Sequence, residues 1–195
     1  MKQPMTARRV AISGGPGGGK STVAAALARE FGARVVVVPE VATHLLGGFF
    51  PGISGPDDRR AVQRAIYHVQ VNLEAVHRSR CERDTVLVFD RGVIDGAAYW
   101  PDGTDAFFSS VCGDPSAARE RYDAVLFLES AAQGGLAIDQ GNSARTEQRA
   151  EAARLDSILY ELWSPHPRFR FVAHTDTFES KVENALGALR ELIGA

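Results

Sequence analysis

The chain has 195 residues, of which 45% are hydrophobic and 24% are charged. These proportions are typical of a folded globular domain, and they exclude disordered, collagen-like and coiled-coil chains. The 22 Lys and Arg residues against 24 Asp and Glu residues leave a formal net charge of −2, which argues against a nucleic acid or an anionic membrane surface as the main partner.

Five short apolar runs, several of them rich in β-branched residues, predict buried strands at residues 10–12, 35–38, 86–89, 125–128 and 169–172. Apolar residues at helical spacing predict amphipathic helices between and after these strands. The helical stripes are Val23, Leu27 and Phe31; Val62, Ile66, Val69, Leu73 and Val76; Leu155, Ile158, Leu159 and Leu162; and Val182, Ala185, Leu186, Leu189 and Ile193. Gly32 stands where a left-handed cap would end the first of these helices.

This alternation of strands and helices predicts an α/β fold, with right-handed crossovers that build a parallel sheet covered by helices on both faces. The length fits a single domain over residues 1–195. In such sheets ligands bind beyond the carboxyl ends of the strands. Functional residues are therefore expected directly after each strand.

The first strand leads into the sequence GGPGGGKS at residues 14–21, and the first helix follows at once. This is the phosphate-binding pattern GxxxxGKS in its strand–turn–helix context. Glycines let successive backbone N–H groups turn toward one anion, and the helix N-terminus adds positive potential. The pattern predicts a site for a nucleoside triphosphate, ATP or GTP, formed by Gly14, Gly15, Pro16, Gly17, Gly18, Gly19, Lys20, Ser21 and Thr22.

Within this loop, Lys20 is expected at the β- and γ-phosphates, the Ser21 hydroxyl on Mg²⁺, and Thr22 at the α-phosphate. The alternative is a flexible glycine turn before a helix. Residues 1–34 hold six basic residues against one acidic residue, and this local excess of positive charge also favours a small anionic ligand.

Two further strands end in acidic residues, Glu40 and Asp90, and Arg91 follows the second of them. Asp90 is the expected carboxylate of the Mg²⁺ shell, and Arg91 is expected to contact the substrate or the transferred phosphoryl group. Glu40 is then free to act as a general base. The alternative roles for Glu40 and Asp90 are strand-end caps and surface ion pairs. Asp95 is a weaker candidate for a functional carboxylate, and Glu129 could compete with Asp90 for the metal.

A lid is predicted at approximately residues 130–150, where Gly134, Gly135 and Gly141 precede a helix bearing arginines. A glycine-hinged segment with arginines can close over phosphates and supply charge to a transition state. Arg145, nearest the hinge, is the favoured lid residue. For Arg149 and Arg154, a solvated helix face shared with Glu147 and Glu151 is equally acceptable.

Weaker signals lie around these motifs. Gln63 and Gln70 share a face of the long helix and could bracket a substrate, and Lys181 and the loop at residues 174–178 could contact a nucleobase. Four aromatic residues near the strand ends favour core packing but could wall a substrate pocket; they are Phe49, Phe50, Tyr99 and Trp100.

Together the segments GGPGGGKST, VVPEVAT, QRAIYHVQ, VFDRGVIDGAAYWP, RYDAVLFLE and RTEQRAEAARLD resemble a family. It is the small P-loop ATP-binding family labelled AAA, which is similar to ribosylnicotinamide kinases and, more distantly, to deoxynucleoside and thymidylate kinases. The resemblance runs from about Arg9 to Lys181. It implies a three-layer αβα P-loop NTPase fold with a five-stranded parallel sheet in the order 2-3-1-4-5. It also implies that Glu40 is the base, that Asp90 and Arg91 form the strand-end pair, and that Arg145 is the lid arginine.

The expected function is a kinase that transfers the γ-phosphoryl group of Mg-ATP, or Mg-GTP, to a nucleoside-like or other small-molecule hydroxyl. The alternative is a regulatory ATP- or GTP-binding NTPase module that acts on a protein partner. No segment is long and apolar enough for a membrane span. Two cysteines, Cys81 and Cys112, cannot form a disulfide framework, so a cytoplasmic location is expected.

Overall fold

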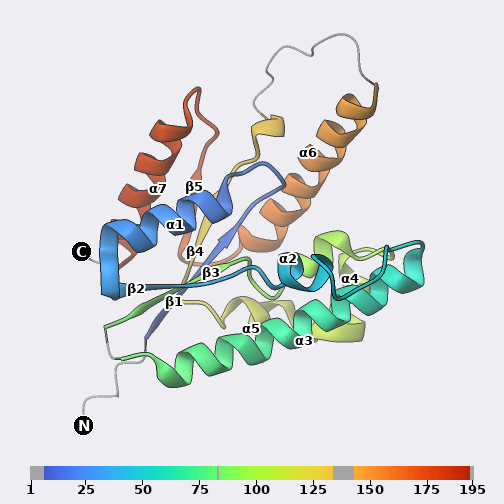
Figure 1. The fold of residues 1–195 in the computed structure, drawn as a ribbon, viewed down its shortest axis with the longest axis horizontal. Coiled ribbons are helices and arrows are strands. Elements are labelled where there is room, and N and C mark those ends of the chain that lie inside the picture. Colours follow the sequence, from blue (N-terminus) through green and yellow to red (C-terminus); the bar gives the residue numbers. More distant parts are fainter. Residues whose placement is uncertain (1–6, 83, 134–142, 194–195) are drawn as a thin grey trace.

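The computed structural model describes residues 7–82, 84–133 and 143–193, and its centre is a five-stranded parallel sheet in the order β2-β3-β1-β4-β5 (Figure 1). This confirms the predicted order. The strands are β1 (Arg8–Ser13), β2 (Val35–Val38), β3 (Val86–Asp90), β4 (Ala124–Leu128) and β5 (Phe169–Val172). Each lies within two residues of its predicted run at both ends.

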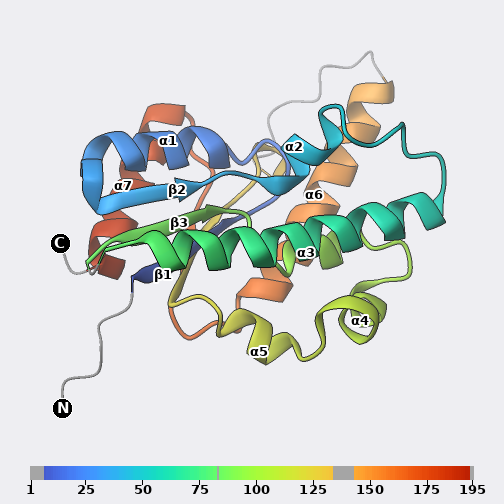
Figure 2. The same cartoon turned by 60° about the horizontal axis from the view of Figure 1, so that its bottom comes forward.

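Helices cover both faces of the sheet, so the fold has three layers (Figure 2). One face carries α1 (Lys20–Phe31) and α7 (Phe178–Ile193). The other carries α3 (Pro56–Arg80), α4 (Thr104–Phe107), α5 (Pro115–Arg119) and α6 (Ser143–Trp163). The remaining elements are α2 (Val41–Leu46), the 3₁₀ turns η1 (Gly32–Arg34), η2 (Asp95–Tyr99) and η4 (Ala131–Gln133), and the π turn η3 (Phe108–Cys112). In the described part of the chain, no helix has the length and apolar character that crossing a membrane requires.

The central strands are buried on both faces, which explains why their sequences are continuous apolar runs. In β1, Ala11 points into the core under α3 and α6, whereas Val10 and Ile12 point into the core under α1 and α7. Every residue of β3 and β4 is buried. Since the strands are parallel, their carboxyl ends meet at one edge, where the predicted functional residues lie.

The predicted apolar face of α3 is only partly correct. Val69 and Val76 belong to the predicted stripe but are 43% and 44% exposed. The helix instead buries three polar side chains, those of Gln63, Gln70 and Glu74. The long helix itself is confirmed, but it is rotated so that a neighbouring face packs on the protein.

Hydrogen bonds explain why this polar face can be buried. The Glu74 carboxylate accepts hydrogen bonds from the Tyr122 hydroxyl at 2.6 Å, from Arg121 Nη2 at 2.9 Å and from Gln70 Nε2 at 3.2 Å. Buried polar groups cost little when they are paired in this way. Tyr122 and Arg121 lie almost 50 residues further along the chain, so the periodicity of α3 does not reveal them.

Candidate functional site at the carboxyl end of the sheet

The loop after β1 wraps closely against the end of β4. Gly14 has a φ of +133°, and a Cβ atom built on it would lie 2.1 Å from the backbone oxygen of Leu128. This position therefore requires glycine for both its conformation and its lack of a side chain. The loop ends where α1 begins at Lys20, so the unpaired N–H groups of the first helical turn border it, which suits an anion.

Lys20 points back into this loop. Its side chain is buried, and Nζ donates hydrogen bonds to the backbone oxygens of Gly14 at 2.7 Å and Gly15 at 2.8 Å. The pKa of Lys20 is lowered to about 8. Burial is the largest cause and the nearby Arg91 guanidinium the second, while the neighbouring carboxylates oppose the shift. The loop carbonyls therefore hold the ammonium group at the predicted phosphate site.

Asp90 is the last residue of β3, and it lies beside Ile12 in the register of the neighbouring strand. Its Oδ2 accepts a hydrogen bond of 2.6 Å from the Ser21 hydroxyl, whereas its Oδ1 is buried and has no hydrogen-bond partner among the described residues. Burial raises the pKa of Asp90.

This pair fits the predicted Mg²⁺ site. A serine hydroxyl and a carboxylate are oxygen donors of the kind that Mg²⁺ prefers, and the ion typically uses only one or two carboxylates with substrate phosphates and water. The unpaired Oδ1 of Asp90 gives a reason for a cation beside it, because a buried carboxylate oxygen without a partner is unfavourable. Ser21 and Asp90 are therefore the residues that would hold the metal.

Arg91 directs its guanidinium toward two carboxylates. Its Nε donates a hydrogen bond to Glu40 Oε1, and its Nη1 lies 3.3 Å from Asp95 Oδ2. The guanidinium also lies over the Tyr99 ring, 5.6 Å from its centroid. The backbone of Arg91 has a left-handed φ of +83°, and its N–H donates to the Ile12 oxygen at 3.0 Å. This tight turn after β3 directs the side chain into the site.

Glu40 lies between β2 and α2, directly before the first residue of the helix. Burial by itself would raise the pKa of Glu40, but the Arg91 guanidinium and the Thr43 hydroxyl outweigh it, and the net shift is downward. Glu40 is therefore a charged carboxylate at neutral pH. It is ready to accept a hydrogen bond from a hydroxyl group.

Asp95 has a more central place than the sequence indicates. It is 2% exposed, and besides Arg91 its carboxylate accepts hydrogen bonds from Trp163 Nε1 at 2.7 Å and from the Ser13 hydroxyl at 2.9 Å. The hydrogen bonds from Trp163 and Ser13 fix the orientation of the Asp95 carboxylate, which in turn holds the Arg91 guanidinium. Ser13 and Trp163 carried no sequence signal, because the contacts join residues 68 and 82 positions apart in the chain.

Beside these residues lies a cavity of about 380 Å³, a volume typical of pockets that bind small molecules. Gln63 and Gln70, the pair expected to bracket a substrate, line it from α3, together with Tyr99 and, from α2, Leu46. The other lining residues are Glu40, Val41, Ala42, Thr43, Ile66, Tyr67, Arg91, Gly92, Val93, Asp95 and Gly96. Aliphatic and aromatic residues thus make up about half of the lining, and most of the rest are polar residues from the start of α2, from α3 and from the turn after β3.

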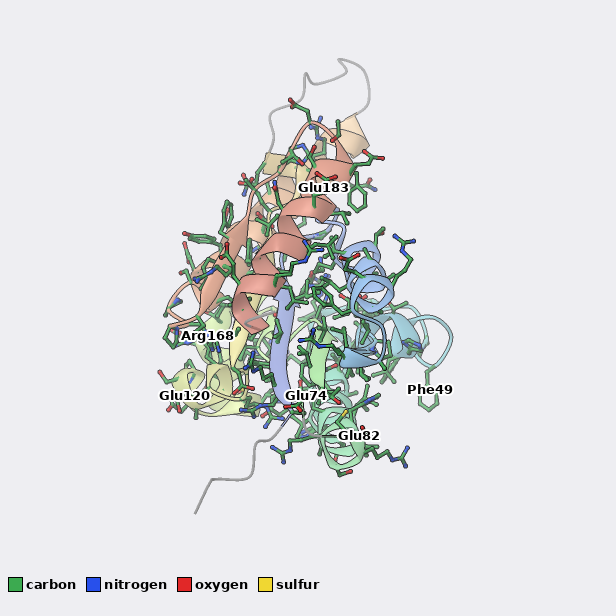
Figure 3. The ribbon with its side chains drawn as sticks, turned by 90° about the vertical axis from the view of Figure 1, so that its left-hand side faces the viewer. Phe49, Glu74, Glu82, Glu120, Arg168 and Glu183 are labelled. Atoms are coloured by element: carbon green, nitrogen blue, oxygen red, sulfur yellow. The ribbon has the colours of Figure 1, made fainter. Side chains whose placement is uncertain are left out.

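Of the other aromatic candidates, Trp100 is buried in the core against Phe107. Phe49 projects into solvent from the loop after α2 and is 81% exposed (Figure 3). Phe50 packs edge-on against Phe49. None of Phe49, Phe50 and Trp100 lines the cavity.

Three other candidates are engaged in contacts of their own. The Glu129 carboxylate accepts a hydrogen bond of 2.7 Å from the His174 backbone; its competition with Asp90 for the metal stays a prediction. Lys181 is buried, and its ammonium donates a hydrogen bond to the Glu129 backbone oxygen; a contact with a nucleobase stays a prediction. Arg154 forms an exposed ion pair with Glu151 at 2.7 Å, as expected for a solvated face.

Three further predictions are left open. Arg145 falls within α6, but its side chain lies outside the described residues, as do the hinge positions 134–142. Thr22 is exposed on the first turn of α1, and its contact with an α-phosphate is untested. Phe178, which ends the loop at 174–178 and begins α7, packs against the phosphate loop so closely that a Cβ at Gly19 would lie 2.4 Å from its ring. A contact of the loop at 174–178 with a nucleobase stays a prediction.

The chain belongs to the AAA domain family AAA_28, whose model matches residues 9–181. Its fold is shared with the deoxyadenosine kinase of M. mycoides with bound dATP, at a TM-score of 0.61 and 14% identity over 94% of this chain and 99% of that one. It is also shared with the thymidylate kinase of Candida albicans, at a TM-score of 0.63 and 16% identity over 97% and 92%. No curated protein is a significant match in sequence. The fold is therefore that of P-loop nucleoside and nucleotide kinases.

Proposed function

We propose that this protein is a phosphotransferase that moves the γ-phosphoryl group of Mg-ATP, or Mg-GTP, to a hydroxyl group of a nucleoside-like or other small molecule. The observation that carries this proposal is the position of the 380 Å³ cavity. It is lined by Glu40 and Arg91, whose charges act on Lys20 of the phosphate loop. A cavity for an acceptor and a loop for a triphosphate therefore share one boundary.

On the donor side, the loop N–H groups and Lys20 would bind the β- and γ-phosphates, and Thr22 the α-phosphate. Ser21 and Asp90 would hold Mg²⁺, which neutralises charge on the β- and γ-oxygens during transfer. Arg91 and Arg145 would add positive charge near the transferred group. These roles follow from the loop pattern and from the pairing of Ser21 with Asp90.

On the acceptor side, Glu40 would accept the proton of the attacking hydroxyl. The hydroxyl oxygen forms a bond to the γ-phosphorus, the bond from that phosphorus to the β-γ bridging oxygen breaks, and the nucleoside diphosphate leaves. The lowered pKa of Glu40 suits a group that positions the nucleophile, because phosphoryl transfer proceeds through a loose transition state that needs little early deprotonation.

The charges of the cavity favour an acceptor that is not itself phosphorylated. Among the described residues that line the cavity, Arg91 is the one cation, and its guanidinium is already shared between Glu40 and Asp95. A phosphate group on the acceptor would meet two carboxylates, and no described lining residue offers it a free cation. An uncharged or cationic hydroxyl compound avoids this repulsion.

The same cavity favours a kinase over a regulatory NTPase. A regulator that works by ordering a surface segment needs a triphosphate site and a partner surface, but no acceptor pocket. Here Gln63, Gln70 and Tyr99 place polar groups in a pocket beside the phosphate loop. A pocket of this kind supports the proposal of a phosphoryl acceptor.

The test is phosphoryl transfer from γ-labelled ATP and GTP to a panel of nucleosides, nucleotides and other hydroxyl compounds. Glu40→Gln should lower kcat for the accepted compound by about 10²- to 10⁴-fold and leave the nucleotide Kd within about twofold. Glu120→Gln, the same change at an exposed position on α5's C-terminal end, is the control and should leave both unchanged. Hydrolysis of the nucleotide with no labelled product from any hydroxyl would refute the kinase proposal.

A further inference from the structure

Asp156, in the middle of α6, is a buried acid that the proposed chemistry does not use. It is 3% exposed. Its Oδ1 accepts two backbone hydrogen bonds, one of 2.6 Å from Gly15 N and one of 3.1 Å from Ser130 N. One carboxylate of α6 is thus hydrogen-bonded both to the phosphate loop and to Ser130, two residues after the end of β4.

The contact between α6 and the loop is close. A Cβ built on Gly15 would lie 2.7 Å from the Asp156 Cβ and 3.1 Å from the Ala152 backbone oxygen, so the loop fits against the helix only because this residue is glycine. Ser130 adds a second attachment, since its hydroxyl donates to the Pro16 backbone oxygen. Two consecutive loop residues are therefore fixed, Gly15 by Asp156 of α6 and Pro16 by Ser130, which Asp156 also binds.

The geometry of the peptide bond connects this contact to Lys20. The N–H of Gly15 and the C=O of Gly14 belong to one planar trans peptide unit, so they point in opposite directions. The N–H points at Asp156, and the Gly14 oxygen accepts a hydrogen bond of 2.7 Å from Lys20 Nζ. Whatever fixes the plane of this peptide also fixes the carbonyl that holds the ammonium group.

We propose that Asp156 is a positioning residue that orients the Gly14–Gly15 peptide and thereby holds Lys20 where it binds the triphosphate. The inference rests on the proposed function in one respect, that Lys20 contacts the nucleotide. Because a negative charge here repels a bound polyphosphate, the benefit of Asp156 comes from its acceptor oxygen and not from its charge.

This distinction sets the choice of variants. Asp156→Ala removes the acceptor, and it should raise the Kd for ATP or GTP in Mg²⁺ by about tenfold, the effect of losing one hydrogen bond. Asp156→Asn keeps an acceptor oxygen without the charge, and its Kd should stay within about twofold or improve. Ile158→Ala is the control, a half-buried apolar residue on the same helix, which should lower the melting temperature and leave Kd unchanged.

A double-mutant cycle tests the route through Lys20. In a Lys20→Met background, Asp156→Ala should cause no further loss of affinity, because the ammonium that it positions is absent. All affinities are measured by calorimetry on folded protein, without turnover, so a wild type that binds nucleotide but phosphorylates nothing would refute the kinase proposal and not this one.

Three results would overturn the inference. The first is an Asp156→Ala protein that melts earlier but binds nucleotide as the wild type does. The second is an equal, additive loss in both backgrounds, and the third is a wild type that binds no triphosphate. If the alanine variant does not fold, amide exchange of the ligand-free wild type decides: the Gly15 N–H should be protected, and free exchange would overturn the inference.

Discussion

The lowered pKa of Lys20 makes nucleotide affinity depend on pH in a defined way. In the ligand-free protein the pKa is about 8, so about nine-tenths of the molecules carry the ammonium charge at pH 7 and about one-tenth at pH 9. A triphosphate beside the amine favours its charged form and raises its pKa in the complex. Binding above pH 8 therefore takes up a proton, and affinity falls as pH rises.

The expected size of this effect follows from the two populations. Between pH 7 and pH 9 the association constant for ATP or GTP in Mg²⁺ should fall about tenfold, which corresponds to about 1.4 kcal/mol. At pH 9 binding should take up close to one proton. Isothermal titration calorimetry in two buffers with different ionisation enthalpies measures both quantities.

Lys20→Met provides the control. The variant has no amine to titrate, so its weaker affinity should not change between pH 7 and pH 9, and proton uptake should disappear. Titration of the nucleotide or of any other residue would appear equally in the variant. Constant wild-type affinity over this range, or an identical decline in the variant, would refute the assignment of the titrating group to Lys20.

Three further predictions concern the metal pair, the polar core and the loop. Asp90→Asn should weaken nucleotide binding ten- to about a hundredfold in Mg²⁺ but within about twofold in EDTA, and an equal loss in both would contradict its metal role. Tyr122→Phe removes the hydroxyl that donates to Glu74 and should lower the free energy of unfolding by about 1–3 kcal/mol, so an unchanged urea midpoint would contradict this network. Gly14→Ala should prevent folding or nucleotide binding, whereas Gly55→Ala, with open space around it, should cost under about 1 kcal/mol; thermal unfolding compares them, and equal melting temperatures would be the contrary result.

The sequence by itself determined the strands, the phosphate loop and the acids at the strand ends. Each of these is recorded in neighbouring residues: an apolar run marks a strand buried on both faces, and GxxxxGKS between a strand and a helix marks a phosphate loop. The positions of Glu40 and Asp90 followed because parallel strands end at one edge of the sheet. Local signals of this kind suffice where the chain's own neighbours set the structure.

Only the tertiary structure decided how these parts are held together. The buried face of α3 depends on Glu74 meeting Tyr122, and the anchoring of Arg91 depends on Asp95, which is itself fixed by Trp163. Most of these partners lie about 50 to 70 residues apart in the chain. Hydrogen bonds between distant residues leave no periodic pattern, since they depend on which surfaces the folded layers bring into contact.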